Sequence, residues 1–521
     1  MVTRWSLHEV VLTSARDYAH PLDDVTVQVT FTAPSGRQTV IEGFWDGGRT
    51  WRARFSPDEA GEWVWQAASS DGGNDGLEGD GGFVCATADA ATSPWLVHGP
   101  LNVSESGTHL EHADGTPFFW LGDTAWNGVL RSTEEDWDRY LDARDALGFN
   151  VIQFVSTQWR GGERCLGGPL PFELREGHLT VDDAYFRRMD ERVRSIAEHG
   201  MVAAPIILWA LTPTDPGQAL PEETAIRLGR YIVARWGAFP VVWLVGGDGH
   251  YYGEAVERWH RMGRGILGED PGARTRLATL HPCGLSWVGE DHRREPWYDF
   301  IGYQSGHSSA DGDLRWLTDG PPATQWRGDP PLPVINLEPN YDEHPSYQGN
   351  VIFGAHEVRR AAYWSLLVSP PAGVTYGANP IWVWPTEVEG AENHDGLGQI
   401  APWHTALEFP GAASMGVLRQ FMEAIPWWDL RPAPEALRVQ PGGDRAEAFV
   451  AAARSTEGSL VVVYTPMGAA IELAADVVPR NATARWFDPA TGRWADADGE
   501  GGRYAPPGGA EMLLVLTAGD R

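Results

Sequence analysis

The sequence contains no lysine, and its 40 strongly basic residues are all arginines. Enzymes that form a Schiff base with a substrate or with pyridoxal phosphate need a lysine amine, and so does the phosphate-binding loop of P-loop nucleotidases. The chain therefore belongs to none of these classes. Its three cysteines, Cys85, Cys165 and Cys283, are widely separated and form no CxxC pair, so we expect no disulfide framework.

Positive charge and long apolar segments are scarce as well. The formal net charge of −31 argues against binding to nucleic acid or to an anionic membrane surface. No run of eighteen apolar residues occurs, and the N-terminal MVTRWSLHEV lacks the apolar core of a signal peptide. We expect a protein that is cytoplasmic as the sequence stands, or secreted if a leader has been removed. No sequence feature indicates an oligomeric state.

Tryptophan, by contrast, is abundant, with 26 residues in the chain. Many of them fall in segments that we predict to be loops following strands. Flat aromatic faces can stack on the apolar faces of sugar rings, so tryptophans at such positions favour a carbohydrate partner.

The pattern along the chain predicts three domains. Residues 1–88 alternate apolar and polar positions between turns, which predicts an immunoglobulin-like β-sandwich. Residues 95–427 show eight apolar runs alternating with amphipathic helices, which predicts an α/β fold, a (β/α)8 TIM barrel. We predict a helix over 313–326 but no clear helix over 287–297. Residues 428–521 return to β character and predict a small C-terminal β-sandwich.

Two of the predicted barrel strands end in a carboxylate. Val241–Gly249 reads VVWLVGGDG and places Asp248 after strand four, while Pro333–Tyr341 reads PVINLEPNY and places Glu338 after strand seven. The chemistry of such barrels sits at the C-terminal ends of the strands, so the pair is typical of acid/base or nucleophilic catalysis. The alternative is that each acid only caps the loop or helix that follows it.

Other polar and aromatic residues follow the remaining strands and are candidates for binding a sugar. Asp123, in the motif LGDTAW, could accept hydrogen bonds from two sugar hydroxyls. For each candidate, the alternative is an ordinary loop hydrogen bond or packing contact. The full set of candidate substrate-binding residues is Asp123, Trp126, Gln158, Trp159, Trp209, His250, His281, Gln304, His307, Tyr376, Trp382 and Trp384.

Metal, serine-hydrolase and nucleotide chemistry find little support. His250, His281, Cys283 and His307 could suggest a metal, but they show no HExxH motif and no paired helical spacing. The chain has no GxSxG nucleophile elbow and no GxGxxG after an opening strand. We therefore expect neither a metal nor an organic cofactor.

Several long motifs resemble one family over nearly the whole chain. They are GFWDGGRTWRARFSPDEAGEW, FFWLGDTAWNG, GFNVIQF, WLVGGDG, LHPCG, FIGYQSGH, INLEPNY, YGANPIWVW and RWFDPATGRW. The chain is similar to barrel proteins long called collagenases or collagen-binding proteins, of which the apiosidases of glycoside hydrolase family 140 are a characterised branch. The resemblance implies a retaining glycosidase with Asp248 as acid/base and Glu338 as nucleophile. Many relatives of that clan carry Asn-Glu after strand four, where this chain has Gly247-Asp248.

Three functional interpretations remain open from the sequence. The first is a retaining glycosidase with its carboxyl groups about 5–5.5 Å apart, acting from the end of a chain in a tryptophan-walled pocket. The resemblance suggests a terminal pentofuranoside such as apiose, although endo action is an alternative. The second is a non-catalytic carbohydrate-binding barrel, which would not need both carboxylates. The third is a collagen-binding adhesin, which would leave the carboxylates after strands four and seven unexplained.

Overall fold

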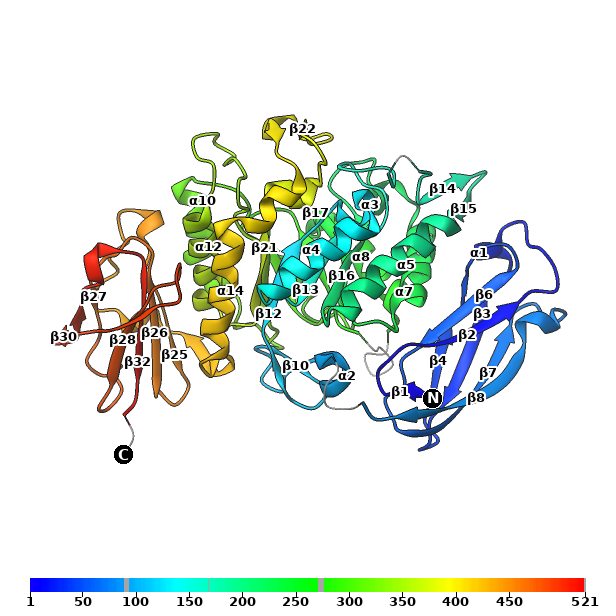
Figure 1. The fold of residues 1–521 in the computed structure, drawn as a ribbon, viewed down its shortest axis with the longest axis horizontal. Coiled ribbons are helices and arrows are strands. Elements are labelled where there is room, and N and C mark those ends of the chain that lie inside the picture. The colour runs from blue at the N-terminus through cyan, green and yellow to red at the C-terminus, as the bar shows by residue number, and fades with distance from the viewer. Residues whose placement is uncertain (89–92, 167, 270–275, 520–521) are drawn as a thin grey trace.

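The computed structural model describes residues 1–88, 93–166, 168–269 and 276–519. A barrel of parallel strands lies in the middle, and two antiparallel β-sandwiches flank it at opposite ends (Figure 1). The predicted fold class is therefore confirmed. No helix among the described residues is long and apolar enough to span a membrane.

The N-terminal sandwich pairs a five-stranded sheet with a three-stranded sheet. Along β3, alternate side chains are buried, including Val29 and Phe31, as the sequence pattern predicts. In sheet order, the strands are β1 (Val2–Thr3), β8 (Gly79–Ala86), β7 (Gly61–Ser69), β3 (Val27–Thr32) and β4 (Gln38–Glu42), then β2 (His8–Thr13), β6 (Thr50–Phe55) and β5 (Phe44–Trp45).

Buried ion pairs fix this sandwich to the barrel. Arg54 of β6 donates to Asp190 of a barrel helix at 2.7 Å, and Arg235 of another barrel helix donates to Asp46 at 2.7 Å. Both guanidinium groups are almost fully buried. Because unpaired buried charges are costly, these contacts hold the sandwich in one orientation.

The barrel strands form one eight-stranded sheet in the order β18-β17-β16-β13-β12-β21-β20-β19. Their bounds are β12 (Trp120–Thr124), β13 (Val151–Val155), β16 (Val202–Trp209), β17 (Trp243–Gly249), β18 (Ala278–Pro282), β19 (Ile301–Gln304), β20 (Val334–Glu338) and β21 (Gly373–Gly377). The seam between β18 and β19 is closed by Thr279, whose hydroxyl donates to the Phe300 carbonyl and accepts from the Gly302 amide.

Helices cover the outside of the barrel. They are α4 (Glu134–Ala146), α5 (Asp183–Glu198), α7 (Glu222–Trp236), α8 (Val256–Leu267), α10 (Asp311–Thr318), α12 (Ala355–Val368) and α14 (Pro410–Glu423). The helix predicted over 313–326 is wrong in length, because α10 ends at Thr318 and a separate turn, α11 (Pro321–Thr324), begins at a proline. The connection over 287–297 holds one short turn, α9 (Gly289–His292).

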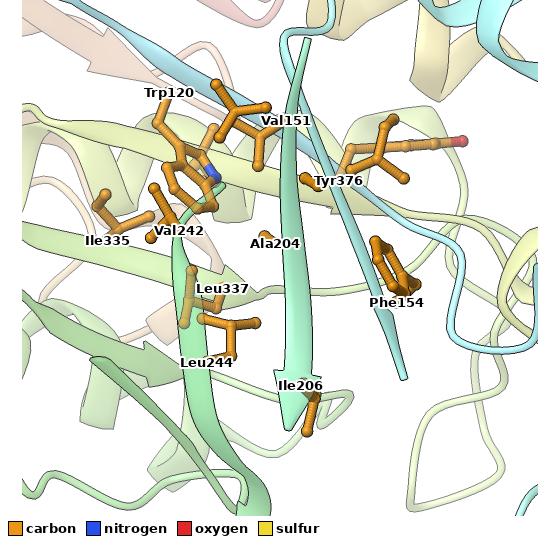
Figure 2. Packing of buried hydrophobic residues seen from close by; sticks show 14 of the residues in the cluster. Trp120, Val151, Phe154, Ala204, Ile206, Val242, Leu244, Ile335, Leu337 and Tyr376 are labelled. Carbon is orange, nitrogen blue, oxygen red and sulfur yellow. The ribbon is translucent and has the colours of Figure 1, made fainter. Parts of the chain in front are cut away.

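Apolar side chains fill the inside of the barrel. Figure 2 shows Trp120, Val242, Leu244, Ile335 and Leu337 gathered together, and all are fully or almost fully buried. The indole of Trp120 also donates to the Thr375 hydroxyl at 2.9 Å. The interior is thus a packed core, which leaves the C-terminal ends of the strands as the place for a site.

Short elements join the barrel strands or lie outside the barrel. They are α1 (Pro21–Asp24), α2 (Pro94–His98), β9 (Leu101–Val103), β10 (Leu110–His112), β11 (Pro117–Phe118), α3 (Gly128–Arg131), β14 (Phe172–Arg175), β15 (His178–Val181), α6 (Pro216–Ala219), α13 (Asn379–Val383), β22 (Glu389–Gly390) and β23 (Gln399–Ile400). The segment with α13, β22 and β23 follows β21 and rises over one end of the barrel (Figure 1).

The C-terminal sandwich packs on α12 and α14 of the barrel. Its Glu511 accepts hydrogen bonds from Arg359 of α12 at 2.6 Å and from the Tyr464 hydroxyl at 2.7 Å. Its sheets, in order, contain β24 (Leu430–Pro432), β25 (Ala451–Ser455), β26 (Leu460–Thr465), β32 (Met512–Thr517), β28 (Thr483–Phe487) and β29 (Trp494–Asp496), then β27 (Ile471–Glu472), β31 (Arg503–Tyr504) and β30 (Gly499–Glu500).

Candidate active site

The structure brings Asp248 and Glu338 together at the C-terminal mouth of the barrel. A carboxylate oxygen of each, and a ring nitrogen of His281, all lie within 4.8 Å of one another. Both acids line a pocket of about 630 Å³. The side chain of Asp248 is 17% exposed and that of Glu338 10%, so both can reach a molecule in the pocket while water has limited access.

Strand β17 is irregular where it carries Asp248. Its pairing with β18 shifts register twice, between Leu244 and Gly247 and between Gly247 and Gly249. Asp248 adopts a left-handed backbone with φ of 47°, which is unfavourable for a residue with a side chain. At Gly247 an added Cβ would lie 2.7 Å from Ile206 and from Trp209, so only glycine allows the strand to pass this close to its neighbour.

Gln304 at the end of β19 orients the Asp248 carboxylate. Its amide nitrogen donates to Asp248 Oδ1 at 2.5 Å and to the Pro282 carbonyl at 2.8 Å. Both amide hydrogens are therefore used, and the rotation of the amide is fixed. Because Oδ1 is held in this way, Oδ2 of Asp248 is the oxygen left to exchange a proton.

His307 holds the Glu338 carboxylate on the other side. Burial lowers the pKa of His307 to about 3, so its ring is neutral at working pH. The Tyr341 amide donates to Nδ1 of this ring at 3.4 Å, so the ring proton is on Nε2. Nε2 then donates to Glu338 Oε1 at 3.0 Å, which favours the ionised form of that carboxyl group.

Burial has the opposite effect on the same group. It raises the pKa of Glu338 above 4.5, while the charges or dipoles of His281, Tyr341, His344 and Arg160 act to lower it. The net effect is to raise the pKa, so Glu338 loses its proton at a higher pH than an exposed glutamate does. The pKa of Glu338 therefore sets the pH at which activity falls on the acidic side, if the reaction needs Glu338 ionised.

His281 lies close to both acids but does not line the pocket. Its Nδ1 is 3.6 Å from Asp248 Oδ1 and its Nε2 is 3.5 Å from Glu338 Oε2, and the ring is fully buried. Neither nitrogen has a hydrogen-bond partner within the described part of the chain. The three groups offer one imidazole and two carboxylates, a donor set that a divalent metal could also accept, in contrast to the expectation from sequence spacing.

Four of the predicted tryptophans line the pocket. Trp126, Trp159, Trp209 and Trp382 are each at most 4% exposed, and the rings of Trp159 and Trp209 lie 4.4 Å apart. Trp209 is the last residue of β16, and the other three come from the segments after β12, β13 and β21. The predicted Gln304 and His307 also line the pocket, and each is hydrogen-bonded to one of the two pocket carboxylates.

The prediction that Asp123 binds a sugar is wrong, because its side chain does not reach the pocket. It lies within β12 rather than after it, and its side chain is fully buried. Its Oδ2 accepts from Arg144 Nε at 2.5 Å and from the Tyr140 hydroxyl at 2.7 Å. The carboxylate is thus the counter-ion of a buried arginine and has no free acceptor facing a sugar.

Five further predicted substrate-binding residues are not among those that line the pocket. Gln158 donates to the Phe172 carbonyl, and Tyr376 is buried and donates to Asp342. Trp384 is stacked on Trp403 at 4.6 Å, and His250 is exposed and hydrogen-bonded to Tyr252. His281 lies against the two carboxylates and does not border the space that a substrate would fill.

Other residues line the pocket that were not predicted from the sequence. Arg160, Tyr341, His344, Tyr347 and His394 all border it. Tyr341 stands three positions after Glu338, so its place in the motif INLEPNY was a signal that could have been used. The others come from loops, whose course the periodicity of apolar residues does not predict.

Three family models match parts of this chain. A family model described as "Apiosidase-like, catalytic domain" matches residues 104–429. A domain of unknown function, DUF5060, matches residues 1–70, and a model described as "Putative collagen-binding domain of a collagenase" matches residues 434–511. No curated protein gave a match.

Solved structures share the fold. One described as a glycoside hydrolase is 23% identical with a TM-score of 0.70, covering 82% of this chain and 99% of that one. A glycoside hydrolase family 5 protein from Bacteroides vulgatus ATCC 8482 is 24% identical with a TM-score of 0.70, covering 82% and 95%. A "putative glycoside hydrolase" from the same organism is 19% identical with a TM-score of 0.70 and covers 99% of both chains.

The apiosidase-like model spans more than half of the chain and includes every barrel strand together with both pocket carboxylates. The chain therefore belongs to the apiosidase-like family and is a glycosidase.

Proposed function

We propose that the protein is a retaining exo-glycosidase in which Glu338 is the nucleophile and Asp248 the acid/base. The observation that carries this proposal is the approach of the two carboxylates, whose oxygens come within 4.8 Å, in one aromatic pocket. Inverting enzymes separate their carboxyl groups by about 6.5–9.5 Å to admit a water, whereas retaining enzymes keep them about 5–5.5 Å apart. The short separation supports the retaining reaction.

In this mechanism Asp248 gives its proton to the glycosidic oxygen while Glu338 attacks the anomeric carbon. The bond to the leaving group breaks and a glycosyl-enzyme ester forms. Asp248, now ionised, then takes a proton from water, and that water releases the sugar from Glu338. His307 supports the ionised nucleophile, and Gln304 keeps one oxygen of Asp248 fixed during both proton transfers.

The shape of the pocket supports action at the end of a chain. Buried tryptophans form its walls, and residues Asn393–Leu397 of the long segment after β21 also border it. A pocket walled in this way suits a terminal sugar better than the middle of a polymer. The description of the matched family makes a pentofuranoside such as apiose the substrate that we propose to test first.

The test is hydrolysis of a panel of aryl glycosides that includes furanosides of apiose and arabinose. We expect one terminal sugar to be released, with the first-formed product keeping the anomeric configuration of the substrate by NMR. Glu338→Gln should lose several orders of magnitude in kcat, because an amide cannot form the glycosyl ester. The matched control is Glu343→Gln, an exposed acid on the same loop, which should keep its activity.

Other results would contradict parts of this proposal. A first product of opposite configuration would replace the retaining mechanism with an inverting one. Early release of mid-length oligosaccharides from a polysaccharide would replace exo action with endo action. A Glu338→Gln variant that folds normally and keeps its rate would remove Glu338 from the nucleophile role.

A further inference from the structure

One aromatic residue of the pocket differs from all the tryptophans that wall it. Tyr347, on the loop between β20 and α12, lines the pocket but is 59% exposed. The wall residues Trp159 and Trp209 are 4% and 1% exposed, because other aromatic rings cover them. A large aromatic ring left open at a binding pocket is the kind of surface that a ligand covers.

The position of Tyr347 is nevertheless well defined. Its backbone amide donates to the His307 carbonyl at 2.8 Å, and its ring meets the His307 ring edge-on at 5.7 Å. An added Cβ at Gly306 would lie 3.3 Å from the Tyr347 hydroxyl, and one at Gly284 would lie 3.8 Å from it. The hydroxyl end therefore rests against two glycines, while much of the ring remains open.

The hydroxyl end of Tyr347 reaches the part of the pocket beside Asp248, while its backbone is anchored at His307, the partner of Glu338. The same Cβ at Gly284 would be 3.2 Å from Gln304 Oε1, and Gln304 is the residue that binds Asp248. Burial of the hydroxyl end and the nearby charges of Glu338 and Asp248 raise the pKa of the Tyr347 phenol. Because an acid/base protonates the departing oxygen, its side of the pocket is where the leaving group must lie.

The pocket is also larger than one sugar ring requires. Its volume of about 630 Å³ falls within the range of about 300–1,000 Å³ that holds drug-sized ligands. The tryptophans and the carboxylates account for the unit that is cleaved off. Tyr347 lines the same pocket, so the pocket offers a second unit both room and an exposed aromatic surface.

We propose that Tyr347 is the stacking platform for the leaving-group sugar and thereby selects which glycosides the enzyme cleaves. The ligand class is a pyranose or furanose residue that presents an apolar C–H face to the ring. This inference rests on the proposed glycosidase activity, since a leaving group is defined only by that reaction. Stacking helps only substrates whose leaving group is large enough to cover the ring.

The experiment compares two leaving groups on the same sugar. One substrate carries a sugar as leaving group, and the other is the glycosyl fluoride, whose leaving atom cannot reach Tyr347. For Tyr347→Ala we expect kcat/KM on the first substrate to fall by about tenfold or more. The loss on the fluoride should stay below about threefold, and Tyr347→Phe, which keeps the ring, should lose little on either substrate.

A second readout follows the glycosyl-enzyme formed from the fluoride. An added sugar acceptor must bind where the leaving group was, so the ratio of transfer to hydrolysis should fall in Tyr347→Ala. Tyr252→Ala is the matched control, because Tyr252 is 49% exposed and follows β17 but is not among the residues that line the pocket. That variant should keep both rates and the transfer ratio.

The outcomes separate this proposal from the function on which it rests. Equal losses of Tyr347→Ala on both substrates, or no loss on either, would overturn the platform while leaving the glycosidase in place. Failure of the wild-type protein to cleave any glycoside or glycosyl fluoride would instead reject the proposed function, and the platform with it.

Discussion

Replacing Asp123 tests whether its carboxylate, near the end of a barrel strand, binds a sugar in the pocket or stabilises the core of the barrel. Asp123 is the counter-ion found for Arg144 among the described residues, and both side chains are fully buried. Without it, the guanidinium would remain in apolar surroundings, 5.3–5.6 Å from the ring centres of Tyr140, Phe149 and Tyr376. Its two terminal nitrogens have no hydrogen-bond partner in the described chain that could take over.

Removing one partner of a buried ion pair costs about 3–5 kcal/mol. Asp123→Ala should therefore lower the free energy of unfolding of the barrel by about that amount and its thermal midpoint by roughly 5–10 °C. Asp123→Asn should lose less, because an amide oxygen can still accept from the Tyr140 hydroxyl. The double change Asp123→Leu with Arg144→Met should recover most of the loss, since it removes the unpaired charge.

Urea unfolding followed by circular dichroism measures the stability, and initial rates well below the midpoint measure KM and kcat. We expect KM of the folded Asp123→Ala variant to change by less than about threefold. A KM raised tenfold or more with an unchanged midpoint would refute the structural role and restore Asp123 as a sugar ligand. Failure of the double variant to recover stability would also refute the reasoning, because the cost would then not come from Arg144.

The remaining predictions concern the pocket itself. Asp248→Ala should slow glycosides with poor leaving groups far more than activated aryl glycosides, and azide should partly rescue it; equal losses without an azide product would mean that Asp248 only positions the sugar. Because burial raises the pKa of Glu338, kcat/KM should fall with decreasing pH through an apparent pKa above 4.5, and Arg160→Gln should move that limb to higher pH by removing a charge that favours the carboxylate. EDTA should leave activity intact, whereas a loss restored by zinc would show that Asp248, His281 and Glu338 hold a metal.

The strands of the barrel were predictable because their residues are buried on both faces. Parallel strands covered by helices appear as unbroken apolar runs, and all five residues of β13 (Val151–Val155) are buried. The same apolar pattern placed Asp248 and Glu338 at the mouth of the barrel, because each is near the C-terminal end of such a run. The pattern therefore finds the strands but not their ends, since β12 runs on to Thr124 and β17 to Gly249.

The direction of each side chain at a strand end was not predictable in the same way. Successive residues of a strand point to opposite faces, so an error of one residue reverses the direction. Because β12 continues to Thr124, Asp123 points to Arg144 of α4 rather than into the pocket. Nothing in the sequence of α4 indicates which strand residue its arginine meets.

The loops were less predictable from the sequence than the strands. Tyr347 and Asn393–Leu397 complete the pocket from segments that have no periodic pattern. The excess of tryptophan predicted an aromatic site. Trp384, however, does not line the pocket and instead stacks on Trp403. Composition therefore indicated the kind of site, and only the course of the loops decides which tryptophans belong to it.

The two carboxylates are held by different means, and the difference matches their proposed roles. Glu338 ends a fully buried strand and is fixed by a neutral histidine whose tautomer is set by the chain, which suits a nucleophile that must stay in one place. Asp248 sits on an irregular strand between glycines, in a left-handed conformation, with one oxygen held and the other free. An acid/base must first donate a proton to a departing sugar and then take one from water on the same side. A short side chain brought close by its backbone, with a single free oxygen, can serve both steps without turning.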